Sequence, residues 1–396
     1  MSISRRSFVR MTAGAGLASM VAPSFARFCP AASPMRVLIL GGTSFLGPAC
    51  TDVLLAHGHH VTHFNRGRLE TKRKEAGRAS VVPDGVEVLY GNRDPDKTAD
   101  EWKGPQDGER DPQSPKGLSQ LVGKKWDAVI DTSGYAPRIV RASAELLKDV
   151  VKSYVFISTI SVYAKNDTPE ADETAAVGHM DDESIEEMGA NFEHYGPLKA
   201  LCEKAAESVM PGRVCNIRPG FIVGPRDVSN RFMYWPRRIS EGGEMAIPGA
   251  PEDPMQMIDV RDLAEWIVHV IEKSVFGTFN ATSPSGAMTL GSFVAACREG
   301  VGADTKFTWI DREFAQAEEF SLPLAIPPIG ELAGFHRRST ERAMKAGLKI
   351  RPMAQTAEAT LKWYNDLTPE VQARVGAHVI KKAAEEELLR RWHERT

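Results

Sequence analysis

A short apolar run that leads directly into a glycine-containing loop constrains this sequence more than any other feature. Residues 35–40 (MRVLIL) have the apolar, β-branched character of a buried parallel strand. The loop GGTSFLG (residues 41–47) follows, and a helix is predicted from Pro48 to His57, before Gly58. Glycines at such a turn let the backbone approach a pyrophosphate, while the helix start offers free N–H groups. The residues predicted to bind a dinucleotide there are Gly41, Gly42, Thr43, Ser44, Phe45, Leu46 and Gly47.

Strand and helix patterns alternate through the first half of the chain. Further strands are predicted at residues 60–64, 86–90, 126–130, 154–157 and 214–218, with helices at 139–151 and 198–210 between them. This alternation predicts an α/β fold with a doubly wound, Rossmann-type parallel sheet. Residues 94–116, rich in charge, Pro and Gly, are predicted to form a surface insertion.

The character of the sequence changes after Pro219. Gly/Pro turns and arginines interleaved with aromatic residues appear, and helices are predicted at 258–273 and 289–301, the second capped by Thr289. We expect a Rossmann domain over residues 35–220, a smaller C-terminal lobe over 221–366 interleaved with it, and a charged helical tail over 368–396.

The first 26 of the 396 residues have the three parts of an export signal. Arg5 and Arg6 precede a weakly apolar stretch (11–22), and small residues allow cleavage after Ala26. The Ser-Arg-Arg-x-Phe core resembles the twin-arginine (Tat) signal, which implies the Tat export machinery as a partner and a periplasmic or otherwise exported protein. No later run of 18 apolar residues occurs, so no stable membrane span is expected.

Charge and cysteine content exclude several classes of protein. Lys+Arg number 49 against Asp+Glu 52, a net charge of −3 that argues against a nucleic-acid partner. The five cysteines, Cys29, Cys50, Cys202, Cys215 and Cys297, form no CxxC pair and no zinc spacing, so no metal is expected.

The end of the second predicted strand bears on the choice of cofactor. An acidic residue there usually binds the ribose 2′-hydroxyl of NAD, whereas an Arg accommodates the 2′-phosphate of NADP. Here Asn65 is neutral and Arg66 follows it. The cofactor is predicted to be NAD or NADP, with a slight preference for NADP.

A tyrosine and a lysine at helical spacing form the candidate catalytic pair. Tyr195 and Lys199 are four residues apart and therefore share one helix face. An adjacent ammonium would lower the pKa of the phenol toward the range of a useful base. The strand 154–157 runs into Ser158 and Thr159, whose hydroxyls are expected at the carboxyl edge of the sheet.

In this combination the sequence resembles the extended short-chain dehydrogenase/reductase superfamily, in its NAD-dependent epimerase/dehydratase branch. The resemblance covers residues 35–364 and includes NIRPGFIVGP (216–225), MIDVRDLA (257–264) and a segment at 339–352. It implies that Tyr195 is the acid/base and that Lys199 is its modulator and a ribose ligand. It also implies that Thr159, with Ser158 as the alternative, assists, and that Asn92 stands where the family usually has an adenine-contacting Asp.

Two segments depart from the family pattern. Ser44 replaces the middle glycine of GxxGxxG, and the GGTxFLG form is similar to a branch that includes chloroplast stem-loop-binding proteins. The segment DTSG (131–134) replaces a more usual apolar, Ala-rich strand end. The departures affect the expected affinity for the cofactor and its local contacts.

Two functions are compatible with the sequence. The first is an NAD(P)-dependent enzyme that acts on a secondary alcohol or ketone of a carbohydrate-like small molecule, with Arg218, Arg226 and Arg231 as candidate ligands of an anionic substrate. The second is a non-catalytic binding protein for RNA or another partner, as the chloroplast relatives allow. The oligomeric state stays open, with a homodimer as one alternative.

Overall fold

The structure is a computed structural model that describes residues 33–75, 80–96, 117–227, 229–376, 380 and 382–395. The predicted signal segment, residues 1–26, and residues 97–116 of the predicted insertion lie outside the described residues. Among the residues that are described, no helix is both long enough and apolar enough to cross a membrane.

A sheet of seven parallel strands forms the larger part of the fold, in the order β10-β6-β5-β4-β1-β2-β3. The strands are β1 (Arg36–Leu40), β2 (His60–Asn65), β3 (Glu87–Tyr90), β4 (Ala128–Asp131), β5 (Ser153–Ile157), β6 (Val214–Pro219) and β10 (Gly277–Ala281). Since β1 pairs with both β2 and β4, the direction of winding reverses between β1 and β4. The predicted doubly wound α/β fold is confirmed, and β10 is a strand that the sequence did not predict.

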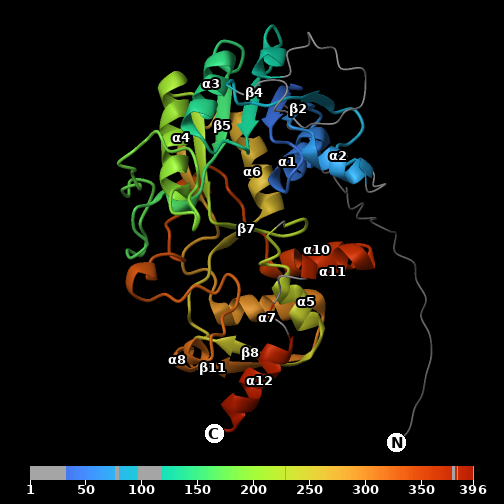
Figure 1. Cartoon of the computed structure of the whole chain (residues 1–396), viewed down its shortest axis with the longest axis vertical. Helices are drawn as coiled ribbons and strands as arrows, with labels where there is room; N and C mark the ends of the chain where they lie inside the picture. The colour runs from blue at the N-terminus through green and yellow to red at the C-terminus, as the bar shows by residue number, and fades with distance from the viewer. Residues whose placement is uncertain are drawn as a thin grey trace, which may run out of the picture. The chain divides into compact units, whose positions relative to one another are not determined.

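Helices cover both faces of this sheet because successive strand side chains point to opposite sides. Val37 and Ile39 of β1 belong to a core shared with α1 (Leu46–Ala56) and α6 (Val260–Lys273). Leu38 and Leu40 belong to a second core, shared with α3 (Pro137–Leu147) and α4 (Tyr195–Val209). Figure 1 shows α3 and α4 on one side of the strands and α1 on the other. The unbroken apolar run of β1 therefore reflects burial on both faces.

Residues after β6 build a smaller lobe with its own aromatic core. Trp235 packs edge-on against Phe293 with ring centroids 5.0 Å apart, and its indole N–H donates to the Pro323 carbonyl. Thr289 caps α7 (Leu290–Val301) through a reciprocal pair of hydrogen bonds with Ser292, which confirms the predicted cap. Before this helix the chain returns to the large sheet through α6 and β10, so lobe and sheet are interleaved. The other elements are α2 (Arg68–Glu75), α5 (Tyr234–Ser240), α7 (Leu290–Val301), α8 (Arg312–Ala317), α9 (Glu341–Lys345), α10 (Met353–Asn365), the pair β7 (Phe221–Val223) and β9 (Met257–Asp259), and the pair β8 (Gly243–Pro248) and β11 (Thr305–Ile310).

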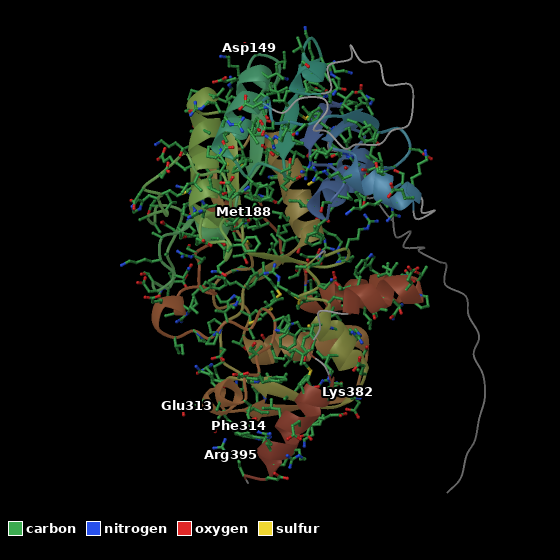
Figure 2. The ribbon with its side chains drawn as sticks, in the orientation of Figure 1. Asp149, Met188, Glu313, Phe314, Lys382 and Arg395 are labelled. Atoms are coloured by element: carbon green, nitrogen blue, oxygen red, sulfur yellow. The ribbon has the colours of Figure 1, made fainter. Side chains whose placement is uncertain are left out.

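The charged C-terminal segment contains α11 (Pro369–Gly376) and α12 (Lys382–His393). Glu385 of α12 is buried and accepts hydrogen bonds from Arg238 Nε at 2.5 Å and from the Ala246 N–H at 3.1 Å. The guanidinium of Arg395 lies 4.6 Å from the ring centre of Phe314 in α8, at the end of the lobe where Figure 2 labels both residues. The last helix is therefore docked on the lobe by an ion pair and an aromatic contact.

Candidate active site

A cavity of about 1,040 Å³ opens at the carboxyl ends of the strands, where the winding of the sheet reverses. Ligands bind at this position in open α/β sheets, and the volume is at the upper end of small-molecule sites. Residues 219–222, 227, 229, 231 and 335 supply the wall on the side of the lobe. The predicted site residues that line the cavity are Gly41, Thr43, Ser44, Phe45, Leu46, Asn65, Arg66, Asn92, Thr159, Tyr195, Lys199 and Arg231.

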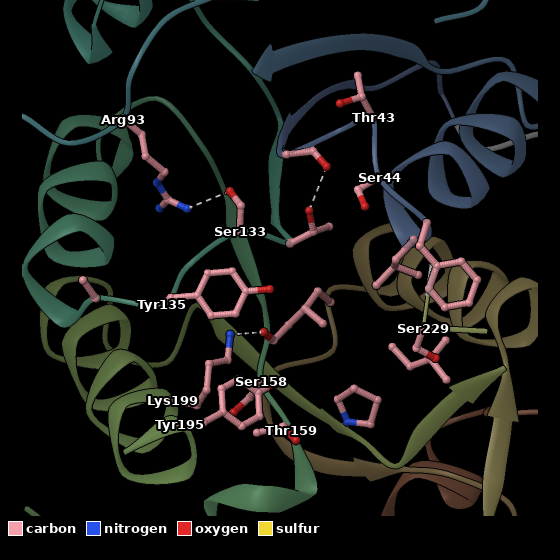
Figure 3. A pocket seen from close by; sticks show the side chains of 18 of the residues that line it. Thr43, Ser44, Arg93, Ser133, Tyr135, Ser158, Thr159, Tyr195, Lys199 and Ser229 are labelled. Atoms are coloured by element: carbon pink, nitrogen blue, oxygen red, sulfur yellow. Dashed lines mark hydrogen bonds between the residues drawn. The ribbon is translucent and has the colours of Figure 1, made fainter. Parts of the chain in front are cut away.

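Two predicted glycines, Gly42 and Gly47, act by close packing behind the cavity wall. A Cβ on Gly47 would lie 2.6 Å from the carbonyl carbon of Gly42 and 2.7 Å from the carbonyl oxygen of Gly41. A Cβ on Gly42 would lie 2.5 Å from the imidazole of His63 in β2. Both glycines therefore let the loop fold tightly between the first strand and the first helix. Ser44, the departure from the family pattern, lines the cavity and faces into it in Figure 3.

Asn65 connects the end of β2 to the glycine loop. Its Oδ1 accepts a hydrogen bond from the Gly42 N–H at 2.8 Å, which fixes the orientation of the amide. Its Nδ2 is buried without a partner among the described residues, as is the hydroxyl of Ser158 across the cavity. Buried polar groups normally have hydrogen-bond partners, so these two atoms suit a polar ligand in the cavity. Together with the glycine loop and the cavity volume, they fit a nicotinamide dinucleotide.

Tyr195 lies at the start of α4, beside the strand end that carries Thr159. Gly196 makes this approach feasible, because a Cβ there would lie 2.0 Å from the carbonyl oxygen of Ser161. Thr159 Oγ1 accepts a hydrogen bond from the Ser161 N–H at 3.1 Å. Burial raises the pKa of Tyr195, while a hydrogen bond with Thr159 and the charge of Arg231 act in the opposite direction. The prediction that a neighbouring ammonium lowers the pKa of Tyr195 is therefore wrong, because burial raises it.

Lys199 is buried and bound to backbone carbonyls. Its Nζ donates to the carbonyl oxygens of Ile157 at 2.6 Å and Gly134 at 2.7 Å, and the ring centres of Phe156 and Tyr135 lie 4.2 and 4.9 Å away. Figure 3 shows this ammonium between the Tyr135 ring and the strand end. Burial lowers the pKa of Lys199 to about 8. The side chain thus ties the ends of β4 and β5 together and fixes the backbone that precedes Ser158.

A buried ion pair that sequence reasoning missed lies at the cavity, where Arg93 is one of the lining residues. Arg93 donates to the two carboxylate oxygens of Asp131 at 2.6 and 2.8 Å, and to Ser133 Oγ at 3.2 Å. Tyr154 donates its hydroxyl to the same carboxylate at 2.7 Å. Burial opposes ionisation of Asp131, but Arg93 and Tyr154 hold the pKa of the carboxyl below its ordinary value. The unusual DTSG strand end is therefore explained by a charge pair, and the sequence signal was an Asp closing an apolar strand.

Asn92, the residue in the family's adenine-contacting position, lines the cavity next to this pair. Its Oδ1 accepts a hydrogen bond from the Asp94 N–H at 3.1 Å, which shapes the turn after β3. Because the turn uses the amide oxygen of Asn92, its amide nitrogen is the group that can donate to a ligand.

Of the three arginines predicted to bind substrate, only Arg231 lines the cavity. Arg218 is buried and forms two hydrogen bonds with the carboxylate of Glu203, at 2.6 and 2.9 Å, so the prediction that it binds substrate is corrected. Arg226 lies outside the cavity lining and is 3.7 Å from the carboxylate of Asp52, so the structure does not bring it to the cavity with Arg231.

Among the described residues, the side chains of His57, His59 and Glu272 form a group with the composition of a metal site. The Met35 N–H donates to His59 Nδ1 at 3.2 Å, so the proton of that ring lies on Nε2, 3.0 Å from Glu272 Oε1. A metal-binding histidine normally donates its second nitrogen to an acceptor, and here that nitrogen is itself the acceptor. Hydrogen bonds account for the group.

The chain is similar to several known proteins. Residues 129–281 match the profile of the NAD dependent epimerase/dehydratase family. The chloroplast stem-loop binding protein of 41 kDa b from Arabidopsis thaliana is 25% identical over 289 residues, which cover 71% of this chain and 67% of that protein. The solved structure of Bordetella bronchiseptica WbmH in complex with NAD+ has a TM-score of 0.54 at 15% identity, covering 84% of this chain and 99% of its own. The solved structure of human epimerase family protein SDR39U1 (isoform 2) with NADPH has a TM-score of 0.51 at 21% identity, and the match covers 82% of this chain and 99% of that one. At such identities the structural likeness shows a shared fold.

Proposed function

We propose that this protein is an NAD(P)-dependent oxidoreductase or epimerase. It has the extended short-chain dehydrogenase/reductase fold, and its residues 129–281 match the NAD-dependent epimerase/dehydratase family. Its substrate is a secondary alcohol or ketone of a sugar-like small molecule. The observation that carries this proposal is that Tyr195, Thr159 and Lys199 converge on the cavity that the glycine loop lines. Thr159 lies two residues after the end of β5, and Tyr195 and Lys199 lie four residues apart on α4.

The side chains divide the proton chemistry between them. A nicotinamide cofactor, when bound, takes up or supplies the hydride. Because burial raises the pKa of Tyr195, its phenol is protonated at neutral pH and is ready to donate to a carbonyl oxygen. Thr159, hydrogen-bonded with Tyr195, places a second hydroxyl beside the same substrate oxygen. Removal of a proton from an alcohol needs the phenolate, so oxidation becomes faster as pH rises.

The residues that would hold the cofactor are the loop 41–47, Asn65, Arg66 and Lys199, with Asn92 toward the adenine. Two solved proteins of this fold are in complex with NAD+ and NADPH, which supports a nicotinamide cofactor. Asn65 brings no carboxylate to the ribose and Arg66 lines the cavity next to it. A cation and a neutral amide at this position favour NADP.

We also propose that residues 1–26 direct export through the Tat pathway, with the cofactor already bound to the folded protein. Nucleotide-sugars are cytoplasmic metabolites, so an exported enzyme is expected to act on a free sugar, a glycoside or another small polyol. Fusion of residues 1–30 to a reporter tests this. Export that is lost when Arg5 and Arg6 are both changed to Lys supports it, and a reporter retained in the cytoplasm contradicts it.

The alternative is a non-catalytic binding protein, since one relative is named for stem-loop binding. One experiment separates the two functions. Nucleotide released from the purified full-length chain is identified by mass spectrometry, and sugars and polyols are then screened by nicotinamide absorbance. Bound NAD or NADP together with turnover supports the enzyme. A protein that binds neither nucleotide supports the alternative.

A further inference from the structure

Arg231 is held in place at the wall of the cavity that the lobe provides. Its Nε donates to Ser229 Oγ at 3.0 Å, and its guanidinium lies 4.9 Å from the ring centre of Phe221. Ser229 in turn donates to the buried carboxylate of Asp227 at 2.7 Å. The chain Asp227–Ser229–Arg231, together with the ring of Phe221, orients a side chain that would otherwise be free to rotate. Ser229 faces the cavity in Figure 3.

The outer edge of this guanidinium is open. Within the part of the chain that the structure describes, the terminal nitrogens of Arg231 have no hydrogen bond and no ion pair. Two other cations of the cavity lining are engaged: Lys199 binds two carbonyls and Arg93 binds Asp131. Arg231 lines the same cavity as Tyr195 and Thr159. A planar fork of N–H donors at this position matches a carboxylate.

We infer that the substrate of this site is a polyhydroxy carboxylate, a sugar acid, whose carboxylate is bound by Arg231 while Tyr195 and Thr159 engage its hydroxyl or ketone. This inference rests on the proposed function and specifies its substrate class. A phosphate ester would offer similar acceptor oxygens, but it carries close to two charges at neutral pH. The single positive charge of the oriented Arg231 guanidinium matches a singly charged carboxylate, and Asp227 in the same wall adds no second cation.

The test uses the full-length protein loaded with its nicotinamide nucleotide. D-glucuronate and D-galacturonate are compared with D-glucose, D-galactose and D-glucose 6-phosphate, by equilibrium binding in a calorimeter and by nicotinamide absorbance. Arg231→Gln removes the charge and the fork, and Arg226→Gln is the matched control, because Arg226 lies outside the cavity lining. The expected result is that Arg231→Gln weakens uronate binding and lowers kcat/KM about 10- to 100-fold. Nucleotide affinity stays unchanged, and Arg226→Gln behaves like the wild type.

Three outcomes overturn the inference: neutral aldoses bind as well as uronates, the phosphate ester binds best, or Arg231→Gln binds the uronate normally. Failure of the proposed function has a different signature, which is the absence of bound nucleotide or of any turnover across the panel. If the proposed function fails in this way, the calorimetric affinities of wild type and Arg231→Gln for the uronate still show whether Arg231 binds the carboxylate.

Discussion

The amide oxygen of Asn65 accepts a hydrogen bond of 2.8 Å from the backbone N–H of Gly42, so the second strand of the sheet holds the glycine loop that follows the first. The amide nitrogen of Asn65 is left buried at the cavity without a partner among the described residues. One side chain therefore shapes the loop and presents a donor to the ligand. Under the proposed function, we expect the side chain of Asn65 to influence the relative affinities of the site for NAD and NADP.

Asn65→Asp should change cofactor preference while preserving the loop. The carboxylate still accepts from the Gly42 N–H, but it now accepts from a ribose 2′-hydroxyl and repels a 2′-phosphate. The ratio of NADP affinity to NAD affinity should fall by at least about 10-fold, since a charge-assisted hydrogen bond contributes roughly 1.5–3 kcal/mol. Titration of both nucleotides against wild type and variant measures this ratio. An unchanged ratio would show that Asn65 does not face the ribose.

Gly47→Ala should weaken nucleotide binding and destabilise the protein. The added Cβ would lie 2.6–2.7 Å from the backbone of Gly41 and Gly42, which has to shift. Overpacking of this kind costs about 1–3 kcal/mol. Gly117→Ala is the matched control, because its Cβ would meet only Asn92 O at 3.5 Å. Urea unfolding and nucleotide titration should both separate the two variants, and equal behaviour would contradict the close packing.

Local patterns predicted the parts of the site that depend on neighbouring residues. The strand–glycine–helix order placed the loop 41–47, and helical spacing placed Tyr195 and Lys199 on one face of α4. Both inferences need only a few consecutive residues and their known geometry. The predicted pKa of Tyr195 was wrong because the prediction considered only the ammonium of Lys199, which is close in the sequence. Burial of the phenol determines the direction of the shift, and it outweighs the opposing charge of Arg231, which is distant in the sequence.

Pairings between distant residues could not be read from the sequence. Arg93 and Asp131 are 38 residues apart, and each alone looks like an ordinary charged residue. Arg218 and Arg231 both looked like candidates for an anionic ligand. Only the fold shows that Glu203 of α4 neutralises the first, whereas the second reaches the cavity.

Arg93→Met should be strongly destabilising, because it leaves the carboxylate of Asp131 buried without its ion-pair partner. Breaking a buried pair on one side costs about 3–5 kcal/mol, measured here as the free energy of unfolding in urea at neutral pH. The double variant Arg93→Met/Asp131→Leu should recover part of that loss. A single variant within about 0.5 kcal/mol of wild type would contradict the importance of the pair for stability.

The stability of Arg93→Met should change with acid in the opposite direction from the stability of the wild type. In the wild type the pKa of Asp131 is held below its ordinary value, so its contribution to stability is present above that value and is lost as pH falls through the lowered pKa. Without Arg93, burial raises the pKa of Asp131, and stability is instead regained as pH falls. The difference in unfolding free energy between wild type and variant should therefore narrow below roughly pH 4. A constant difference from pH 7 to pH 3 would assign the effect to packing.

Turnover by Tyr195→Phe tests the central claim most directly. With a substrate from the panel that the wild type converts, loss of the phenol should lower kcat about 10²- to 10⁴-fold, the usual contribution of a positioned acid or base. Nucleotide affinity and thermal stability should remain those of the wild type, and Tyr364→Phe in α10 provides a matched control away from the cavity lining. A Tyr195→Phe variant that binds nucleotide and turns over within twofold of the wild type would contradict the assignment of Tyr195 as the acid/base.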